Sequence, residues 1–365
     1  MRFGYHSSST STRREFLRRS VSIGGVAPLM LAFPTSVMAL PAKDDEGGYR
    51  VSIPSMGSLI EIQWIGSESI QAKSVAQAAS ECADRWVDVL SDSQQDSECM
   101  QLCRQGVDGE WRAVSDALWR VMLECDRWHR LSEGAFDAAL GALTRLRRSR
   151  KPFSESEWRD ARARCGWEHV DLDREGHRVR LLRPGVMLDF GAIGKGFVVD
   201  RIGESLRSIG IDRFLVNASG NMLCGEAIET ERGPQAEKSW PISIGTLGDP
   251  KLVLKQLRLK RCGIATSGDQ FQKFRDAGSE EGAKPTSHIL DPEKRRGLDA
   301  PNMATVITES ASDADALATI CCVHLQRGSL SSWKARVEAE LPRAEYVLQS
   351  WRDRAIAYTS IPCDW

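Results

Sequence analysis

The sequence lacks the features that would assign it to several large classes of protein. No run approaches the roughly 18 uninterrupted apolar residues of a membrane-spanning helix, which excludes a polytopic membrane protein. The ten cysteines form no paired CxxC motif, which disfavours a zinc or iron–sulfur site. HExxH and GxSxG are both absent, and no segment repeats at the period of a solenoid. The function must therefore be inferred from other motifs.

The chain also has little net charge, although its charge is unevenly distributed. Over 365 residues, 49 Lys and Arg nearly balance 50 Asp and Glu. Hydrophobic residues make up 41% and charged residues 27%, which is typical of a globular protein and excludes a disordered chain. Five arginines lie in residues 1–20 against one glutamate, so the remainder is mildly acidic. A remainder without a clustered basic face predicts no binding of nucleic acid.

The first 39 residues have the order of an export signal. Arg13 and Arg14 form a twin-arginine pair, the run Val21–Phe33 carries no charge, and small residues flank Met38. A basic amphipathic helix is the alternative, but the arginines precede the apolar run and do not recur along one face. We expect export of the folded protein by the twin-arginine route to the periplasm. The predicted organisation is a signal peptide at 1–39, a polar tether at 40–48 and one catalytic domain at 49–365.

The hydrophobic pattern of the remainder predicts a mixed fold. Alternation of Ile60, Ile62 and Trp64 indicates a half-buried strand. Apolar residues at helical spacing in 67–90 and 111–131 predict two long core helices. Predicted strands and helices follow one another without regular alternation. This order favours an α+β fold with mostly antiparallel sheets and flanking helices over a doubly wound parallel sheet.

A glycine-rich segment is the most informative motif. An apolar strand predicted at 186–189 leads through Gly191, Gly194 and Gly196 into a helix, with Lys195 between the last two glycines. Glycines let backbone N–H groups approach an anion, and the helix N-terminus and Lys195 add positive charge, so the segment suits a phosphate. It is not a Walker A loop, because glycine occupies the Ser/Thr position, and it lacks the other kinase motifs. A glycine-rich turn without a ligand remains the alternative.

Two further segments carry candidate chemistry. Asp315 and Thr319 are four residues apart on a predicted helix and suit an oxygen-bound cation such as Mg²⁺, although Ser312 with Asp315 equally fits a helix cap. His288 lies in a polar segment with Asp291, and an ordinary pKa of about 6.5 allows a histidine to act as a base. A lone histidine is more often a surface residue. A Ser–His–Asp hydrolase is the runner-up, without a nucleophile motif to support it.

Eight segments between Met56 and Val323 together resemble one family. They are Met56–Ser58, Asp96–Glu98, Gly134–Asp137, Leu188–Asp200, Val216–Gly220, Ala265–Gly268, His288–Pro292 and Ala314–Thr319. In this order they resemble the ApbE family, the flavin transferases that move FMN from FAD onto a Thr or Ser of a target protein. The resemblance implies a single α+β domain related to the T-fold, with FAD bound between its halves.

The resemblance also implies the roles of individual residues. The metal ligands would be the Ala192 carbonyl, Asp315 and Thr319, which favours Mg²⁺ over the helix cap. His288, or else Asp291, would take the proton from the acceptor hydroxyl. The residues implied to bind FAD are Met56, which would pack on the isoalloxazine, and Ala135, Phe136, Asp137, Asp189, Lys195, Thr266, His288 and Leu290.

The implied activity is Mg²⁺-dependent transfer of FMN from FAD, as substrate, with release of AMP. The expected partner is an exported or membrane-associated redox protein that carries an acceptor Thr or Ser. Two alternatives stay open: an FAD pyrophosphatase that uses the same site, and an exported FAD-binding protein without turnover. Two departures from the family pattern motivate the second: Ser219–Asn221 in place of Gly-Gly-Asp, and a missing tyrosine near Ser93. A third departure is Lys294–Gly297 after the Asp-Pro pair.

Overall fold

The structure is a computed structural model of the whole chain. It describes residues 21–22, 42–43, 48–65, 70–149, 153–226, 239–247, 249, 252–268, 273–274, 286–352 and 355–357. The twin-arginine pair and most of the predicted signal peptide lie outside these residues. Ala42 and Lys43, which belong to the predicted tether, form the short strand β2 and pair with β3.

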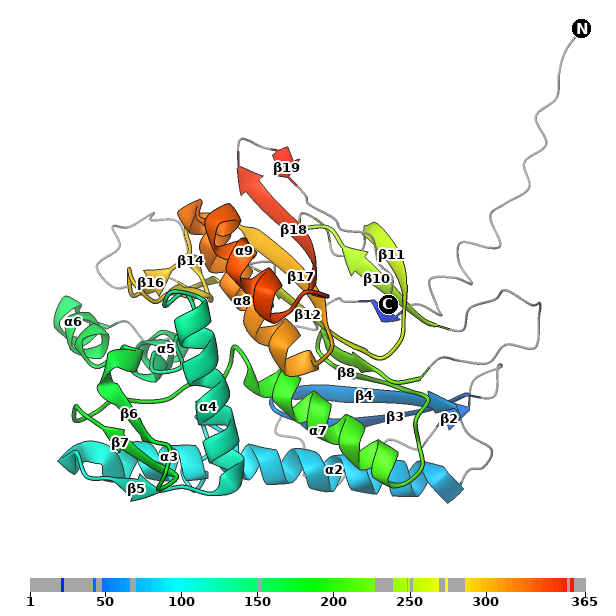
Figure 1. Cartoon of the computed structure of the whole chain (residues 1–365), viewed down its shortest axis with the longest axis horizontal. Helices are drawn as coiled ribbons and strands as arrows, with labels where there is room; N and C mark the ends of the chain where they lie inside the picture. Colours follow the sequence, from blue (N-terminus) through cyan, green and yellow to red (C-terminus); the bar gives the residue numbers. More distant parts are fainter. Residues whose placement is uncertain are drawn as a thin grey trace, which may run out of the picture.

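A nine-stranded sheet forms the centre of the fold (Figure 1). Its order is β19-β18-β17-β12-β9-β8-β4-β3-β2, and every pair of neighbouring strands is antiparallel. The predicted α+β fold with antiparallel pairing is therefore confirmed. The strands are β2 (Ala42–Lys43), β3 (Gly48–Ser55), β4 (Ser58–Ile65), β8 (Phe214–Ala218), β9 (Asn221–Cys224), β12 (Cys262–Gly268), β17 (Asn302–Thr308), β18 (Glu345–Arg352) and β19 (Ala355–Ala357).

Three helices cover one face of this sheet. They are α2 (Ile70–Leu90), α7 (Gly194–Ser208) and α8 (Ala311–Arg327), and they pack against β3, β8, β9, β12 and β17. The face of β4 that carries Ile60, Ile62 and Trp64 is completely buried, as its alternation predicts. The two predicted long helices are present as α2 and α4 (Asp116–Leu131). Ser115 sets the start of α4, because its side chain accepts a hydrogen bond from the Leu118 N–H.

A hairpin covers the opposite face of the sheet. It consists of β10 (Trp240–Gly245) and β11 (Val253–Leu259), with β1 (Val21–Ser22) parallel to β10. The β10–β11 hairpin and the sheet enclose a second apolar core, in which Met222, Ile264 and Ile307 of the sheet pack with Ile242 and Leu257 of the hairpin. The sheet is thus buried on both faces in this region.

A smaller group of elements lies at the other end of the molecule, around α4 (Figure 1). It includes the three-stranded sheet β5-β7-β6, in which β6 and β7 form an antiparallel hairpin. Helix α9 packs against α8. The remaining elements are α3 (Glu98–Gln105), η1 (Gly106–Asp108), β5 (Arg112–Ala113), α5 (Gly141–Arg148), α6 (Glu155–Ala163), η2 (Trp167–His169), β6 (Val170–Asp173), β7 (Arg178–Leu181), β13 (Lys273–Phe274), β14 (Thr286–Ser287), β15 (Leu290–Asp291), β16 (Arg296–Gly297) and α9 (Leu330–Glu340).

The strand predicted at 186–189 is wrong. Val186 and Leu188 are fully buried, which explains the apolar pattern, but the backbone here pairs with a loop and not with a strand. The Asp189 N–H donates to the Ala138 carbonyl (2.8 Å), and the Met187 carbonyl accepts from the Gly141 N–H (2.9 Å). An apolar run cannot by itself distinguish these two kinds of burial.

Two further findings concern the helices and the cysteines of the described residues. No helix among the described residues is long and apolar enough to cross a membrane. The nine cysteines that the structure describes are buried thiols, and no disulfide joins them.

His324 connects the end of α8 to the rest of the molecule. It is 2% exposed and stacks on Trp333 of α9, with ring centroids 4.6 Å apart. Its Nε2 donates to the Ser132 carbonyl (3.2 Å), so in the neutral ring Nδ1 accepts from the Ser329 hydroxyl (2.8 Å). Burial lowers the pKa of His324 from 6.5 to about 4.

This pKa predicts acid destabilisation. The unfolded chain binds a proton near pH 6.5 and the folded chain near pH 4, so stability falls as pH drops between these values. Between pH 7 and pH 5 we expect His324 to account for a loss of about 1–2 kcal/mol in the free energy of unfolding. Urea unfolding at both values should show a smaller loss in His324→Gln. His177→Asn is the control, because His177 is exposed and Asn tolerates its left-handed φ of 46°. If His324→Gln lost as much free energy of unfolding between pH 7 and pH 5 as the unchanged protein, the prediction would be contradicted.

Candidate active site

The first turns of α7 and α8 meet at the centre of the molecule (Figure 1). The Gly196 N–H of α7 donates to Asp315 Oδ2 of α8 at 3.0 Å, and Asp315 is 3% exposed. A Cβ atom at Gly196 would lie 2.2 Å from the Ala311 carbonyl oxygen and 2.8 Å from the Asp315 Cβ. The glycine is therefore required because the two backbones approach too closely for any side chain.

A second carboxylate makes the reverse contact. Asp200 of α7 accepts from the N–H groups of Ala311 (2.7 Å) and Ser312 (2.9 Å) and from the Ser312 hydroxyl (2.7 Å). Each helix thus places a carboxylate at the N-terminus of the other, where unpaired N–H groups and the helix dipole favour negative charge. We call these two contacts the carboxylate exchange.

The helix-cap interpretation of Asp315 is wrong. The N-cap of α8 is Ser310, whose side chain accepts from the Asp313 N–H. Ser312 donates to Asp200 and does not cap α8 with Asp315. The carboxylate of Asp315 is therefore not used by its own helix and faces the glycine-rich start of α7.

Burial affects both carboxylates of this junction. Burial raises the pKa of Asp315 above its ordinary value, while the positive charge of Lys195 and the Gly196 N–H oppose the rise. Burial also raises the pKa of Asp200 to about 6, although its three hydrogen bonds favour the ionised form. A nearby cation would therefore favour the ionised form of Asp315.

The structure places Thr319 and Thr266 differently. The Thr319 hydroxyl lies 3.0 Å from the hydroxyl of Ser267 on β12. Thr266 pairs with Thr305 of β17, with their hydroxyls 2.8 Å apart. Side chains alternate along a strand, so Ser267 faces α8 and Thr266 faces the other side of the sheet. Ser267 is thus the β12 side chain that contacts Thr319 on the α8 side of the sheet.

Asp189 and Ala192 precede α7. Asp189 Oδ1 accepts from the Gly191 N–H (2.8 Å), and Oδ2 lies 3.2 Å from Arg148. Arg148 also pairs with Asp92, whose pKa is raised by burial and by the charge of Asp189. Arg148 therefore holds two acidic side chains beside the glycine-rich loop. Ala192 is half-buried within that loop.

The segment with Ala135, Phe136 and Asp137 forms the neighbouring wall. Ala135 and Phe136 are each 2% exposed. Asp137 accepts from the N–H groups of Ala139 (2.7 Å) and Trp167 (2.9 Å), so its carboxylate fixes the loop backbone. Burial nevertheless raises the pKa of Asp137. Since Ala138 bonds to Asp189, this wall is directly connected to the glycine-rich loop.

His288 lies in a segment that buried charges hold on both sides. Arg147, 4% exposed, donates to the Ser287 carbonyl (2.9 Å). On the other side, Asp291 is ion-paired with Arg327 of α8. Burial opposes ionisation of Asp291, but Arg327 and two backbone N–H groups outweigh it and lower its pKa.

Two of the residues predicted to bind FAD, Leu290 and Met56, pack against apolar side chains of the protein. Leu290 is buried in a small core with Leu140 and Leu143. Met56 lies in the two-residue turn between β3 and β4, where it and Gly57 have φ values of 51° and 70°. It is partly buried against the main core.

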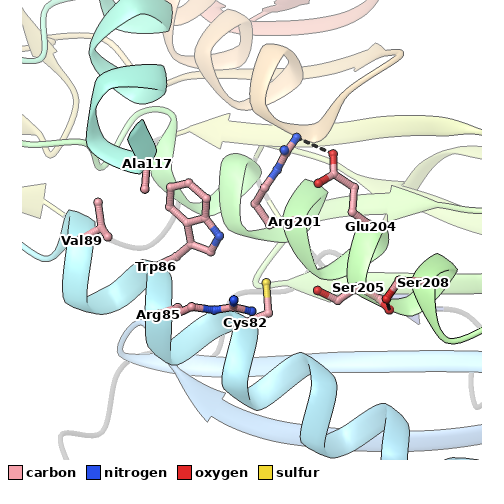
Figure 2. A pocket seen from close by; sticks show the side chains of 9 residues that line it. All are labelled: Cys82, Arg85, Trp86, Val89, Ala117, Arg201, Glu204, Ser205 and Ser208. Atoms are coloured by element: carbon pink, nitrogen blue, oxygen red, sulfur yellow. Dashed lines mark hydrogen bonds and ion pairs between the residues drawn. The ribbon is translucent and has the colours of Figure 1, made fainter. Parts of the chain in front are cut away.

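A cavity lies on a different face of α7 (Figure 2). It has a volume of about 430 Å³ and lies between α2, α4 and α7. Figure 2 shows Trp86 of α2 beside Arg201 of α7, which pairs with Glu204 at 2.8 Å. None of the residues that line it is a predicted site residue. Among the described residues there is also no cluster of three or more His, Cys, Asp or Glu that would bind a metal.

The sequence model of the ApbE family matches residues 56–341. The chain belongs to the ApbE family. A protein of Treponema pallidum named FAD:protein FMN transferase is 31% identical over 256 residues, which are 64% of this chain and 67% of that protein. A protein of the same name from Chlamydia muridarum is 30% identical over 229 residues, 60% of this chain and 67% of that protein.

The fold is that of solved ApbE structures. The flavin transferase ApbE of Vibrio cholerae superimposes with a TM-score of 0.71 at 24% identity, covering 86% of this chain and 96% of that one. An apbe protein of Thermotoga maritima gives the same TM-score at 23% identity, covering 86% and 97%.

The sequence analysis missed three residues that shape the candidate site of this ApbE protein. Asp200 closes the glycine-rich motif and sits one helical turn after Gly196, which was an available signal. Ser267 lies beside the predicted Thr266, but strand alternation alone could not say which of the two faces α8. Arg147 carried no signal, because its contact with Ser287 spans 140 residues of sequence.

The close approach at Gly196 gives a matched pair of substitutions. We expect Gly196→Ala to lower the free energy of unfolding by about 1–3 kcal/mol, because its Cβ would contact backbone atoms of Ala311. A Cβ at Gly194 would meet only ordinary contacts, at 3.5 Å and 3.8 Å. Gly194→Ala should therefore leave stability unchanged or raise it by up to about 1 kcal/mol. Urea unfolding of both variants tests this, and equal effects would argue against the close approach.

Proposed function

We propose that this chain is an FAD:protein FMN transferase, which transfers FMN from FAD to a Thr or Ser hydroxyl of a target protein and releases AMP. The observation that carries the proposal is the junction of α7 and α8, where Asp315 and Lys195 lie at a glycine-rich helix N-terminus. Such a terminus binds anionic groups such as a pyrophosphate. The names of the relatives support the same activity.

The oxygen donors at this junction fit Mg²⁺. Among the described residues Asp315 accepts one hydrogen bond, through Oδ2, so its carboxylate retains lone pairs for a cation. Thr319 adds a hydroxyl one turn further along α8, and the Ala192 carbonyl precedes α7. Mg²⁺ binds one or two carboxylates and completes its shell with substrate phosphates and water, so a cluster of acids is not needed. When bound, it would neutralise charge on the pyrophosphate oxygens.

The residues of the chain divide the remaining work. Lys195 would bind a phosphate oxygen and stabilise the charge that grows on the bridging oxygen as AMP leaves. Asp189 and the wall of Ala135, Phe136 and Asp137 would hold the dinucleotide. Arg148 keeps Asp189 in place.

His288 is the better candidate for accepting the proton of the acceptor hydroxyl. Asp291 is committed to Arg327 and has a lowered pKa, which makes it a poor base at neutral pH. His288 follows Ser287, whose carbonyl is fixed by Arg147. The acceptor oxygen would then form the bond to the FMN phosphorus while the pyrophosphate bond breaks. The product is a phosphodiester-linked FMN protein.

The departure from the family pattern at Ser219–Asn221 lies in the turn between β8 and β9. Ser219 and Gly220 form the two-residue turn between β8 and β9, with φ values of 55° and 96°. The Gly220 N–H donates to Asn217 Oδ1 at 2.9 Å. Asn221 is 3% exposed. The β8–β9 hairpin therefore forms with a single glycine in its turn.

The direct test is the mass of the products. The protein is incubated with FAD, Mg²⁺ and a candidate target. The target is then denatured, and its mass is measured by mass spectrometry. We expect one FMN phosphodiester on a Thr or Ser and one AMP per FMN transferred. AMP with free FMN in the absence of a target would instead indicate an FAD pyrophosphatase. Retained FAD without any AMP would contradict both activities.

The same assay tests the metal site. Asp315→Asn should lower Mg²⁺-dependent transfer at least about 100-fold, because the amide supplies no negative charge to the cation. Asp313→Asn is the matched control, since Asp313 lies on the same helix and pairs with Arg127. Thermal unfolding should show both variants folded. Full activity in Asp315→Asn would rule out this residue as a metal ligand.

We also propose that the protein is exported to the periplasm by the twin-arginine route. The support is the sequence around Arg13 and Arg14, which lies outside the described residues. Replacing both arginines by lysine should leave the protein inside the cell with its leader uncleaved. Cell fractionation and the mass of the N-terminal peptide measure this. Export of the double-lysine variant at the normal level would contradict the route.

A further inference from the structure

Asp200 and Ser310 together accept from the N–H groups of the first four residues of α8. The first four N–H groups of a helix have no partner within it. Ala311 and Ser312 donate to Asp200, at 2.7 Å and 2.9 Å. Asp313 and Ala314 donate to the side chain and carbonyl of Ser310, at 3.1 Å and 3.2 Å. The start of α8 is therefore satisfied without any contribution from Asp315.

This division of labour leaves Asp315 available for another partner. If Asp200 were removed, the N–H groups of Ala311 and Ser312 would be buried without an acceptor. They lie one turn before Asp315 on the same helix. Their positive field would compete for nearby carboxylates, and the start of α8 would be free to shift. Asp315 and Thr319 project from the next two turns of the same helix, so any shift of its start moves both.

The packing at Gly196 transmits such a shift directly. The Ala311 carbonyl and the Asp315 Cβ lie where a Cβ of Gly196 would be, so α7 and α8 are in backbone contact at this point. Asp200 lies one turn after Gly196 on α7 and holds the other end of the contact. Four hydrogen bonds thus join the two helices. Asp200 of α7 accepts three of them, and Asp315 of α8 accepts the fourth.

We propose that Asp200 is a positioning residue for the cation: it binds no metal itself, but by capping α8 it holds Asp315 and Thr319 in register with the glycine-rich start of α7. The inference rests on the proposed function, because it takes Asp315 and Thr319 as the metal ligands. It adds a residue whose effect is on metal affinity and not on the chemical step. Asp200 also couples the phosphate-binding helix to the metal-binding helix.

The test measures cation binding without turnover. Mn²⁺ is used as the probe for the Mg²⁺ site, and its dissociation constant is measured by electron paramagnetic resonance on the full chain without FAD. We expect Asp200→Asn to weaken Mn²⁺ binding at least about tenfold. Ser312→Ala, which removes only one of the three bonds to Asp200, should weaken it about two- to threefold. Asp200→Glu should bind more tightly than Asp200→Asn, because a carboxylate is restored.

A remote cap provides the control for a general loss of stability. Ser154 forms a complete capping box with Glu157 at the start of α6. Ser154→Ala should lose a cap of the same kind yet bind Mn²⁺ like the unchanged protein. Thermal unfolding of each variant confirms that the measured chains are folded, and Ser312→Ala keeps the test valid if Asp200→Asn does not fold.

The outcomes separate the two proposals. Mn²⁺ binding by the unchanged protein that Asp315→Asn abolishes, and that Asp200→Asn and Ser312→Ala leave intact, would overturn the positioning role alone. Weakening by Ser154→Ala to the same degree as by Asp200→Asn would also overturn it. No Mn²⁺ binding by the unchanged protein, either alone or with inorganic pyrophosphate added in place of the substrate phosphates, would overturn the metal site and, with it, the role of Asp200.

Discussion

The carboxylate exchange between α7 and α8 is the interaction on which the rest of the site depends. Two helices begin at one point, and each offers the other's N-terminus a buried carboxylate in place of water. The arrangement brings the glycine-rich loop, Lys195 and Asp315 together in a small volume. It also explains why Gly196 has no side chain, since the contact is between backbones. The proposed phosphate site and the proposed metal site consequently lie at one junction.

The walls of the site are fixed by long-range polar contacts and not by the sheet. Arg147 and the Asp291–Arg327 pair hold the segment with His288 from two sides. His324 ties the end of α8 to Ser132, just before the wall of Ala135, Phe136 and Asp137. Helix α8 therefore carries Asp315 and Thr319 and also bonds to Asp291, in the segment with His288, and to Ser132, next to the wall. A single rigid helix thereby relates the three parts of the site to one another.

Patterns that depend on local spacing were predicted correctly. The alternation of Ile60, Ile62 and Trp64 identified β4, and helical spacing identified α2 and α4, because burial of one face repeats with the period of the element. The ordered motifs identified the family and its fold. The apolar run before Asp189 misled, since a buried loop shows the same composition as a buried strand. The cap considered as an alternative for Ser312 and Asp315 is wrong, because their partners belong to another helix.

The sequence by itself determined the α+β class, the family, and which residue types could carry the chemistry, since these follow from periodicity and from motifs that are continuous in the chain. Only the tertiary structure decided what those residues do with one another. In the structure Asp315 accepts from the Gly196 N–H of α7, and Ser267, not Thr266, contacts Thr319. Asp291 forms an ion pair with Arg327. The physical reason is distance along the chain: hydrogen bonds and ion pairs between residues 36 to 140 positions apart leave no periodic trace in the sequence.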